Sequence, residues 1–239
     1  MLAAVAACGK KQDMESAGKA GDSARATDSV GGKNASPSAP SSASSRSTVN
    51  VLFFGTSLTA GYGLEPAQAF PTLVARTAAK EGLPINAINA GLSGETSAGA
   101  VRRVAWILKR PVDVVVVETG GNDALRALDA DTLRANLAAI IRGVRRAQPG
   151  ARILLAVMEA PPNLGALYTS QFRNAYRQVA RDEGVTVVPF LLNGVAGIDS
   201  LNQADAVHPN FAGEKIVADN VWKALKPVVE EVYRERLSG

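Results

Sequence analysis

The chain has 239 residues, with 26 lysine and arginine residues against 22 aspartate and glutamate residues, a formal net charge of +4. This composition is typical of a globular protein, and the length allows one large hydrophobic core or two small ones. The single cysteine, Cys8, excludes an intramolecular disulfide, and the single histidine, His208, excludes a zinc site built from several histidines. Basic residues form no block, so we expect no nucleic-acid partner.

Residues 9–48 differ in composition from the rest of the chain. They contain ten serines, no aromatic residue and one branched aliphatic residue, Val30. Such a segment buries too little apolar surface to offset the entropy lost on ordering, so we expect a disordered tether rich in Ser, Ala and Gly. Dense apolar runs begin at Val49, which predicts one folded domain over residues 49–239.

Residues 1–8 resemble the end of a bacterial lipoprotein signal. Val5-Ala6-Ala7-Cys8 is similar to the lipobox, in which small residues precede a cysteine that is lipidated after cleavage. The apolar stretch is short and no lysine or arginine precedes it, so we expect the true start upstream of Met1. This pattern predicts a lipid anchor at Cys8 in the periplasm or cell envelope, or secretion if Cys8 is not lipidated. The alternative is an ordinary amino terminus with an unpaired cysteine.

Short apolar runs alternate with helical patterns along the predicted domain. The runs are rich in valine and isoleucine, which is typical of parallel strands buried on both faces; they cover residues 49–54, 85–89, 112–117, 153–157 and 185–190. Segments of period 3.6 lie between them, and a last helix is expected over residues 211–234. Strict β–α alternation predicts one parallel sheet covered by helices on both sides.

The loops that follow the strands contain the parts of an acyl-transfer site. In open α/β sheets, ligands bind beyond the carboxyl ends of the strands. Ser57 follows the first run and needs a base, for which His208, after the fifth run, is the only imidazole. Asp205 can fix the tautomer of that imidazole. The N–H groups of Ser57 and Gly94 and the side-chain amide of Asn122 are candidate donors to an oxyanion.

Four motifs resemble the sequence blocks of the SGNH hydrolases, also called GDSL esterases and lipases. They are Gly55-Thr56-Ser57-Leu58, Gly94, Gly120-Gly121-Asn122-Asp123 and Asp205-Ala206-Val207-His208-Pro209, in the order found in that family. The residues around the second and third motifs are similar to the secreted bacterial thioesterase, lysophospholipase and arylesterase branch.

This resemblance implies a single-domain, three-layer α/β/α fold of the flavodoxin-like type, with a five-stranded parallel sheet in the order 2-1-3-4-5. It also implies a catalytic triad of Ser57, Asp205 and His208, an oxyanion hole of Ser57, Gly94 and Asn122, and no metal or organic cofactor.

The chain departs from the family pattern at Thr56, where the family usually has an aspartate that holds the nucleophile turn through hydrogen bonds. A threonine hydroxyl can still donate and accept a hydrogen bond but carries no charge. We therefore expect activity to survive. Glu118 and Asp123, close to the site, are expected to bind loop backbone, and the pairs Arg102-Arg103 and Arg145-Arg146 to lie on solvated helix faces.

The expected function is that of a serine esterase acting on short to medium acyl esters or thioesters through a covalent acyl-enzyme. Tyr62, Leu164 and Leu167 are candidates for the apolar wall of the substrate pocket, although ordinary packing explains them equally well. Two alternatives stay open: a carbohydrate O-deacetylase of the same fold, and a non-catalytic envelope protein that binds lipid or glycan. We expect a monomer whose only membrane contact is the anchor at Cys8.

Overall fold

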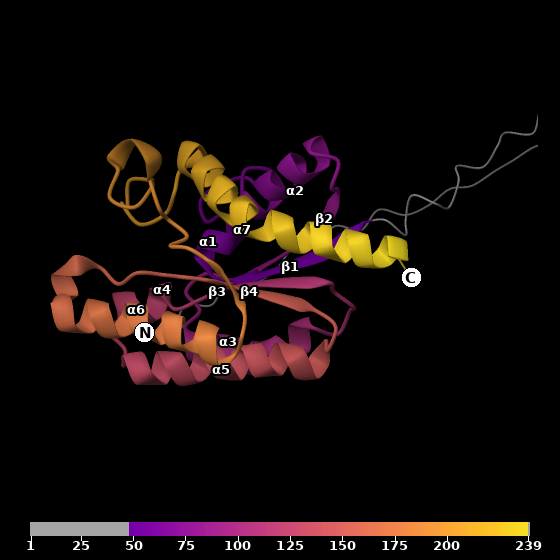
Figure 1. The fold of residues 1–239 in the computed structure, drawn as a ribbon. Helices are drawn as coiled ribbons and strands as arrows, with labels where there is room; N and C mark the ends of the chain where they lie inside the picture. The colour runs from indigo at the N-terminus through magenta and orange to yellow at the C-terminus, as the bar shows by residue number, and fades with distance from the viewer. Residues whose placement is uncertain (1–47, 239) are drawn as a thin grey trace, which may run out of the picture. The chain divides into compact units, whose positions relative to one another are not determined.

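The computed structural model describes residues 48–238, so the expectations for residues 1–8 and for the tether up to residue 47 lie outside the described residues. Five parallel strands form one sheet in the order β2-β1-β3-β4-β5 (Figure 1). The strands are β1 (Val49–Gly55), β2 (Ile85–Gly91), β3 (Val114–Glu118), β4 (Arg152–Ala156) and β5 (Thr186–Val188). The predicted strands and their order are confirmed. β5 is shorter than its apolar run because Pro189 has no N–H for the ladder.

Helices cover both faces of the sheet, as the alternating pattern predicted. Figure 1 places α2 and α7 on one face and α3, α5 and α6 on the other. The helices are α1 (Ser57–Ala60), α2 (Phe70–Lys80), α3 (Ser97–Ile107), α4 (Gly121–Leu125), α5 (Ala130–Ala147), α6 (Ala166–Asp182) and α7 (Phe211–Ser238), with short 3₁₀ turns η1 (Pro162–Leu164) and η2 (Asp199–Leu201). Within residues 48–238, no helix is both long enough and apolar enough to cross a bilayer.

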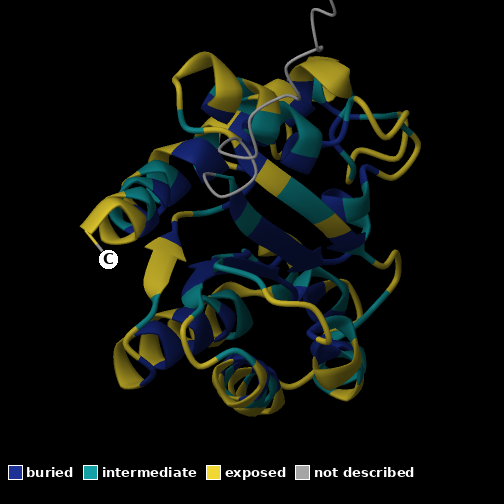
Figure 2. Ribbon diagram, turned by 90° about the vertical axis from the view of Figure 1, so that its right-hand side faces the viewer, coloured by how far each residue is buried: buried dark blue, intermediate teal, exposed yellow. Residues whose placement is uncertain are grey.

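The core lies on the two faces of the central strands. Val114–Val117 of β3 and the side chains of Phe53 and Phe54 on β1 are at most 1% exposed, and Figure 2 shows these strands enclosed between helices with exposed outer sides. The expectation of burial on both faces is wrong for the two edge strands. Residues of β2 range from buried to exposed, and two of the three residues of β5 are exposed. Each edge strand has a neighbour on one side only, so the helical layers cover it incompletely.

A carboxyl group is buried between α2 and α7. Glu214, in the first turn of α7, is 2% exposed, and its Oε2 accepts a hydrogen bond from the backbone N–H of Phe70 at 2.6 Å. Burial raises the pKa of Glu214 to about 8, and the charge of Glu118 acts in the same direction. The folded protein therefore holds a proton at neutral pH that the unfolded chain has released.

We predict that Glu214 makes the protein less stable as the pH rises. The folded-state pKa lies above the ordinary value of 4.5, so the stabilisation is complete below that value and is lost as the pH rises through about 8. Glu214→Gln keeps a neutral acceptor oxygen, so its Tm should fall less than that of the wild type between about pH 6 and pH 9. If calorimetry showed the same fall in Tm for both proteins, Glu214 would not be the group responsible for the pH dependence. Glu230→Gln, at a half-exposed position of α7, is the control.

Candidate active site

Ser57, His208 and Asp205 form a hydrogen-bonded chain at the carboxyl edge of the sheet. Ser57 is the first residue of α1, directly after β1, and its Oγ lies 2.9 Å from Nε2 of His208, 151 residues away in sequence. Nδ1 of the same imidazole lies 2.7 Å from Oδ2 of Asp205. The imidazole thus bridges hydroxyl and carboxylate, which is the geometry that lets a histidine remove the serine proton.

The Asp-x-x-His spacing gives Asp205 a second function within its own loop. Oδ1 of Asp205 accepts the backbone N–H groups of Val207 and His208, each at 2.9 Å. The backbone N–H of His208 is the main cause that lowers the pKa of Asp205 to about 2; burial opposes it, and the ring of His208 lowers the pKa further. The carboxylate is therefore ionised at neutral pH and accepts a hydrogen bond from the Nδ1–H group, which leaves Nε2 free to act as a base.

Gly94 and Asn122 lie beside Ser57 around a common cavity. Gly94 has φ of +78°, a conformation that disfavours a side chain, and the position its Cβ would occupy is open space. Nδ2 of Asn122 donates to the carbonyl of Glu95 at 3.0 Å. Because an amide nitrogen carries two hydrogens, the second is available to a ligand. The three expected donors are brought to one place.

A buried carboxylate holds the nucleophile turn. Glu118, at the end of β3, is 1% exposed and accepts three hydrogen bonds, from the N–H of Thr56 at 2.8 Å and from the hydroxyls of Thr56 and Thr59 at 2.9 Å. Burial raises the pKa of Glu118, and these donors oppose that effect. Thr56 thus supplies a neutral donor where an aspartate would face a second carboxylate. Gly55 is required here, because a Cβ would lie 2.0 Å from Oγ1 of Thr59.

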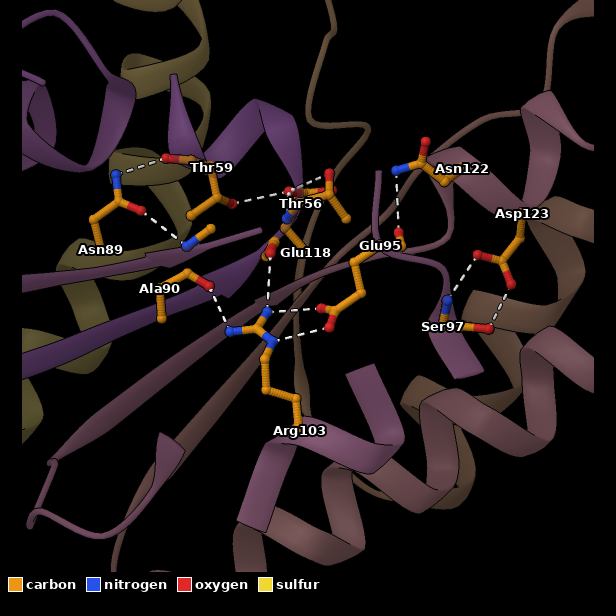
Figure 3. A network of polar contacts seen from close by, with 12 residues as sticks. Thr56, Thr59, Asn89, Ala90, Glu95, Ser97, Arg103, Glu118, Asn122 and Asp123 are labelled. Atoms are coloured by element: carbon orange, nitrogen blue, oxygen red, sulfur yellow. Dashed lines mark hydrogen bonds and ion pairs between the residues drawn. The ribbon is translucent and has the colours of Figure 1, made fainter. Parts of the chain in front are cut away.

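The expected backbone contacts of Glu118 and Asp123 are confirmed. Asp123 accepts the backbone N–H of Ser97 at 2.8 Å and the hydroxyl of the same residue, which joins the start of α4 to the start of α3 (Figure 3). Tyr176 of α6 donates to the carbonyl of Thr119 at 2.6 Å, in the loop between β3 and α4. The turn that carries Asn122 is therefore held from two sides.

The expectation of solvated helix faces is wrong for one of the four arginines. Arg102 and Arg146 are exposed, and Arg145 is half-exposed in an ion pair with Glu183. The side chain of Arg103, in contrast, is only 16% exposed and donates hydrogen bonds to the carboxylate of Glu95 and the carbonyl of Ala90 (Figure 3). Helical periodicity places a residue on a face but cannot reveal a carboxylate that another segment brings to that face.

A cavity of about 520 Å³ opens beside the triad, and most of its wall is apolar. The loop after β4 borders it, as expected, through residues 159–162. Further apolar wall comes from Met158, which also follows β4, and from the segments after β3 and β5, in which the sequence analysis named no wall residue: Leu125, Phe190, Leu192, Ala196 and Val207.

The three candidate wall residues have different positions. Tyr62 lines the cavity, and its ring lies 4.6 Å from the imidazole of His208 between centroids, tilted by 38°. Leu164 packs against the hydrophobic core, and Leu167 is 74% exposed. Neither leucine lines the cavity. Tyr62 therefore covers one side of the imidazole.

Comparison with known proteins agrees with this geometry. Residues 53–216 match the model of the GDSL-like lipase/acylhydrolase family. The chain is 38% identical to Esterase TesA of Pseudomonas aeruginosa over 75% of this chain and 89% of that protein. It is 32% identical to the Escherichia coli K12 protein named thioesterase 1/protease 1/lysophospholipase L1, over 75% and 84% of the two chains. The chain belongs to the GDSL-like lipase/acylhydrolase family.

A solved structure supports the same assignment. The psychrotrophic esterase EstA from Pseudoalteromonas, in a structure inhibited by monoethylphosphonate, is 30% identical and superimposes with a TM-score of 0.71 over 76% of this chain and 98% of that chain. This esterase therefore shares the overall fold of the chain, whose sheet has the order β2-β1-β3-β4-β5. The family resemblance of the four sequence motifs is confirmed.

We predict that the hydroxyl of Thr56 stabilises the nucleophile turn. Thr56→Val keeps the shape but removes a donor from the buried carboxylate of Glu118, which should lower the free energy of unfolding by about 1–2 kcal/mol. Thr56→Ser keeps the donor and is the matched control. Urea unfolding measures both, and wild-type stability in Thr56→Val would show that the hydrogen bond contributes nothing.

Proposed function

We propose that this family member is a serine esterase that hydrolyses short to medium acyl esters or thioesters through a covalent acyl-enzyme. The observation that carries the proposal is the chain from Ser57 through His208 to Asp205, which ends at an apolar cavity. Relatives named esterase, arylesterase and thioesterase support this reaction class.

The geometry supports the following function for each group. Oγ of Ser57 attacks the carbonyl carbon of the substrate while Nε2 of His208 takes the hydroxyl proton, and Asp205 stabilises the imidazolium. The carbonyl oxygen becomes an oxyanion that accepts hydrogen bonds from the N–H groups of Ser57 and Gly94 and from the amide of Asn122. When the tetrahedral intermediate collapses, the imidazolium gives its proton to the leaving alkoxide or thiolate. Water then cleaves the acyl-enzyme by the same steps.

The apolar lining of the cavity favours an acyl chain over a sugar as the bound part of the substrate. A sugar ring requires polar partners around it, whereas an apolar wall gains free energy from burying methylene groups. Met158, Phe190 and Leu192 contribute such a wall next to His208. The O-deacetylase alternative has no comparable support, and the intact hydrogen-bonded triad argues against a non-catalytic binding protein.

We predict that the triad residues contribute unequally. Ser57→Ala and His208→Ala should lower kcat for p-nitrophenyl acetate and butyrate by about 10⁴-fold or more, because nucleophile and base act as a unit. Asp205→Ala should retain a larger residual kcat than the other two variants. Its Nε2 can still accept the proton, although the imidazole has lost its orienting partner. Hydrolysis by Ser57→Ala at the wild-type rate would refute the proposed function.

We predict that narrowing the cavity changes the chain-length preference. Ala160 is 9% exposed and lines the cavity, so Ala160→Phe should lower kcat/KM for p-nitrophenyl octanoate about 10-fold or more relative to the acetate. Ala166→Phe, at the exposed start of α6, is the matched control and should leave the ratio unchanged. An unchanged ratio in Ala160→Phe would mean that the acyl chain binds elsewhere.

We propose further that the chain is anchored in the cell envelope through a lipid at Cys8. The support is the sequence Val5-Ala6-Ala7-Cys8 followed by a serine-rich segment. Two-phase detergent partitioning of the protein expressed in a bacterial host tests this. The wild type should enter the detergent phase and Cys8→Ser should not, whereas equal partitioning of the two would contradict the anchor.

A further inference from the structure

One arginine behind the active site contacts three separate segments (Figure 3). Nε and Nη2 of Arg103 donate to the two carboxylate oxygens of Glu95 at 2.9 and 2.7 Å. Nη1 donates to the carbonyl of Ala90 at 3.0 Å, and Nη2 to the carbonyl of Gly55 at 3.2 Å. The guanidinium also lies 4.4 Å from the centroid of the Phe54 ring. A single side chain of α3 thus joins the ends of β1 and β2 to the loop after β2.

The contacted residues are direct neighbours of the proposed catalytic groups. Gly55 precedes Ser57 by two residues, and Glu95 follows Gly94 immediately. The carbonyl of Glu95 also accepts the side-chain amide of Asn122 at 3.0 Å. Glu95 therefore adjoins two of the three proposed oxyanion donors, and Arg103 links it to the backbone that carries the third.

We propose that Arg103 and Glu95 are a positioning pair that fixes the oxyanion donors relative to the nucleophile. The inference rests on the proposed acyl-transfer function of the same site. Neither residue lines the cavity, so the pair acts through Gly94, Asn122 and Ser57 and not on the substrate.

The chemistry of the pair favours positioning over stabilisation. The side chains of Arg103 and Glu95 are only 16% and 6% exposed, and a desolvated ion pair often stabilises a fold no more than an apolar pair of similar volume. A planar guanidinium bound to both carboxylate oxygens, however, fixes direction as well as distance. The pair therefore contributes geometry that an apolar pair could not supply.

A positioning function has a kinetic signature. Oxyanion donors bind the transition state and not the ground state, so displacing them lowers kcat and leaves KM unchanged. A displacement of about 1 Å can cost about 100-fold in rate. A boronic acid that forms a tetrahedral adduct with the serine should lose affinity by the same factor.

The experiment compares four variants in the full chain: Arg103→Met, Arg103→Lys, the double variant Glu95→Leu with Arg103→Met, and the control Arg102→Met, at an exposed neighbouring position. We measure Tm, kcat and KM for p-nitrophenyl butyrate, and Ki for phenylboronic acid. Arg103→Met leaves a buried carboxylate unpaired and is expected to lose stability. The double variant removes both charges and keeps the measurement informative if the single variant does not fold.

We expect the double variant to recover a Tm near that of the wild type, while kcat stays about 10- to 100-fold low, KM is unchanged and Ki rises by the same factor. Arg103→Lys should keep the charge but fall between the wild type and Arg103→Met in kcat. Wild-type kcat and Ki in the folded double variant would overturn the inference, as would equal losses in Arg102→Met. Failure of the wild type itself to hydrolyse esters would instead refute the proposed function.

Discussion

The parallel direction of all five strands is the constraint on which the site depends. Because every strand points the same way, every strand ends at one edge, and the loops after β1, β2, β3 and β5 supply Ser57, Gly94, Asn122 and the Asp205–His208 loop. β1 lies between β2 and β3, so the segments that carry the proposed oxyanion donors Gly94 and Asn122 flank the strand that precedes Ser57. The strand order reverses between β1 and β3, and open α/β sheets bind their ligands at such a switch point.

Buried charge behind that edge gives the loops their rigidity. Glu118 holds the nucleophile turn, Asp123 joins α3 to α4, and the ion pair of Glu95 with Arg103 connects β1, β2 and the Gly94 loop. Each of these groups is almost completely removed from water, a costly arrangement unless its hydrogen bonds are satisfied. Because hydrogen bonds are directional, such a network fixes loop positions that apolar packing alone would leave variable.

Local patterns predicted the parallel sheet and the Asp205–His208 contact, whereas the strand order came from the resemblance to the SGNH hydrolases. Apolar runs such as Val114–Val117 mark a buried strand, and the Asp-x-x-His spacing brings the carboxylate of Asp205 to the imidazole within one loop. Arg103 was assigned to the surface because its partners come from other elements, and long-range contacts leave no periodic signal. Leu167 failed as a wall residue for a related reason, since proximity to a strand end does not determine side-chain direction.

The central claim is that Ser57 is a nucleophile activated by His208, and covalent trapping tests it most directly. After incubation with a fluorophosphonate, intact-mass and peptide analysis should place one adduct on Ser57 in the wild type, and His208→Ala should react far more slowly. The structure of a related esterase inhibited by monoethylphosphonate makes this reagent class a suitable probe. An unmodified Ser57, or equal reaction rates in the wild type and His208→Ala, would contradict the account.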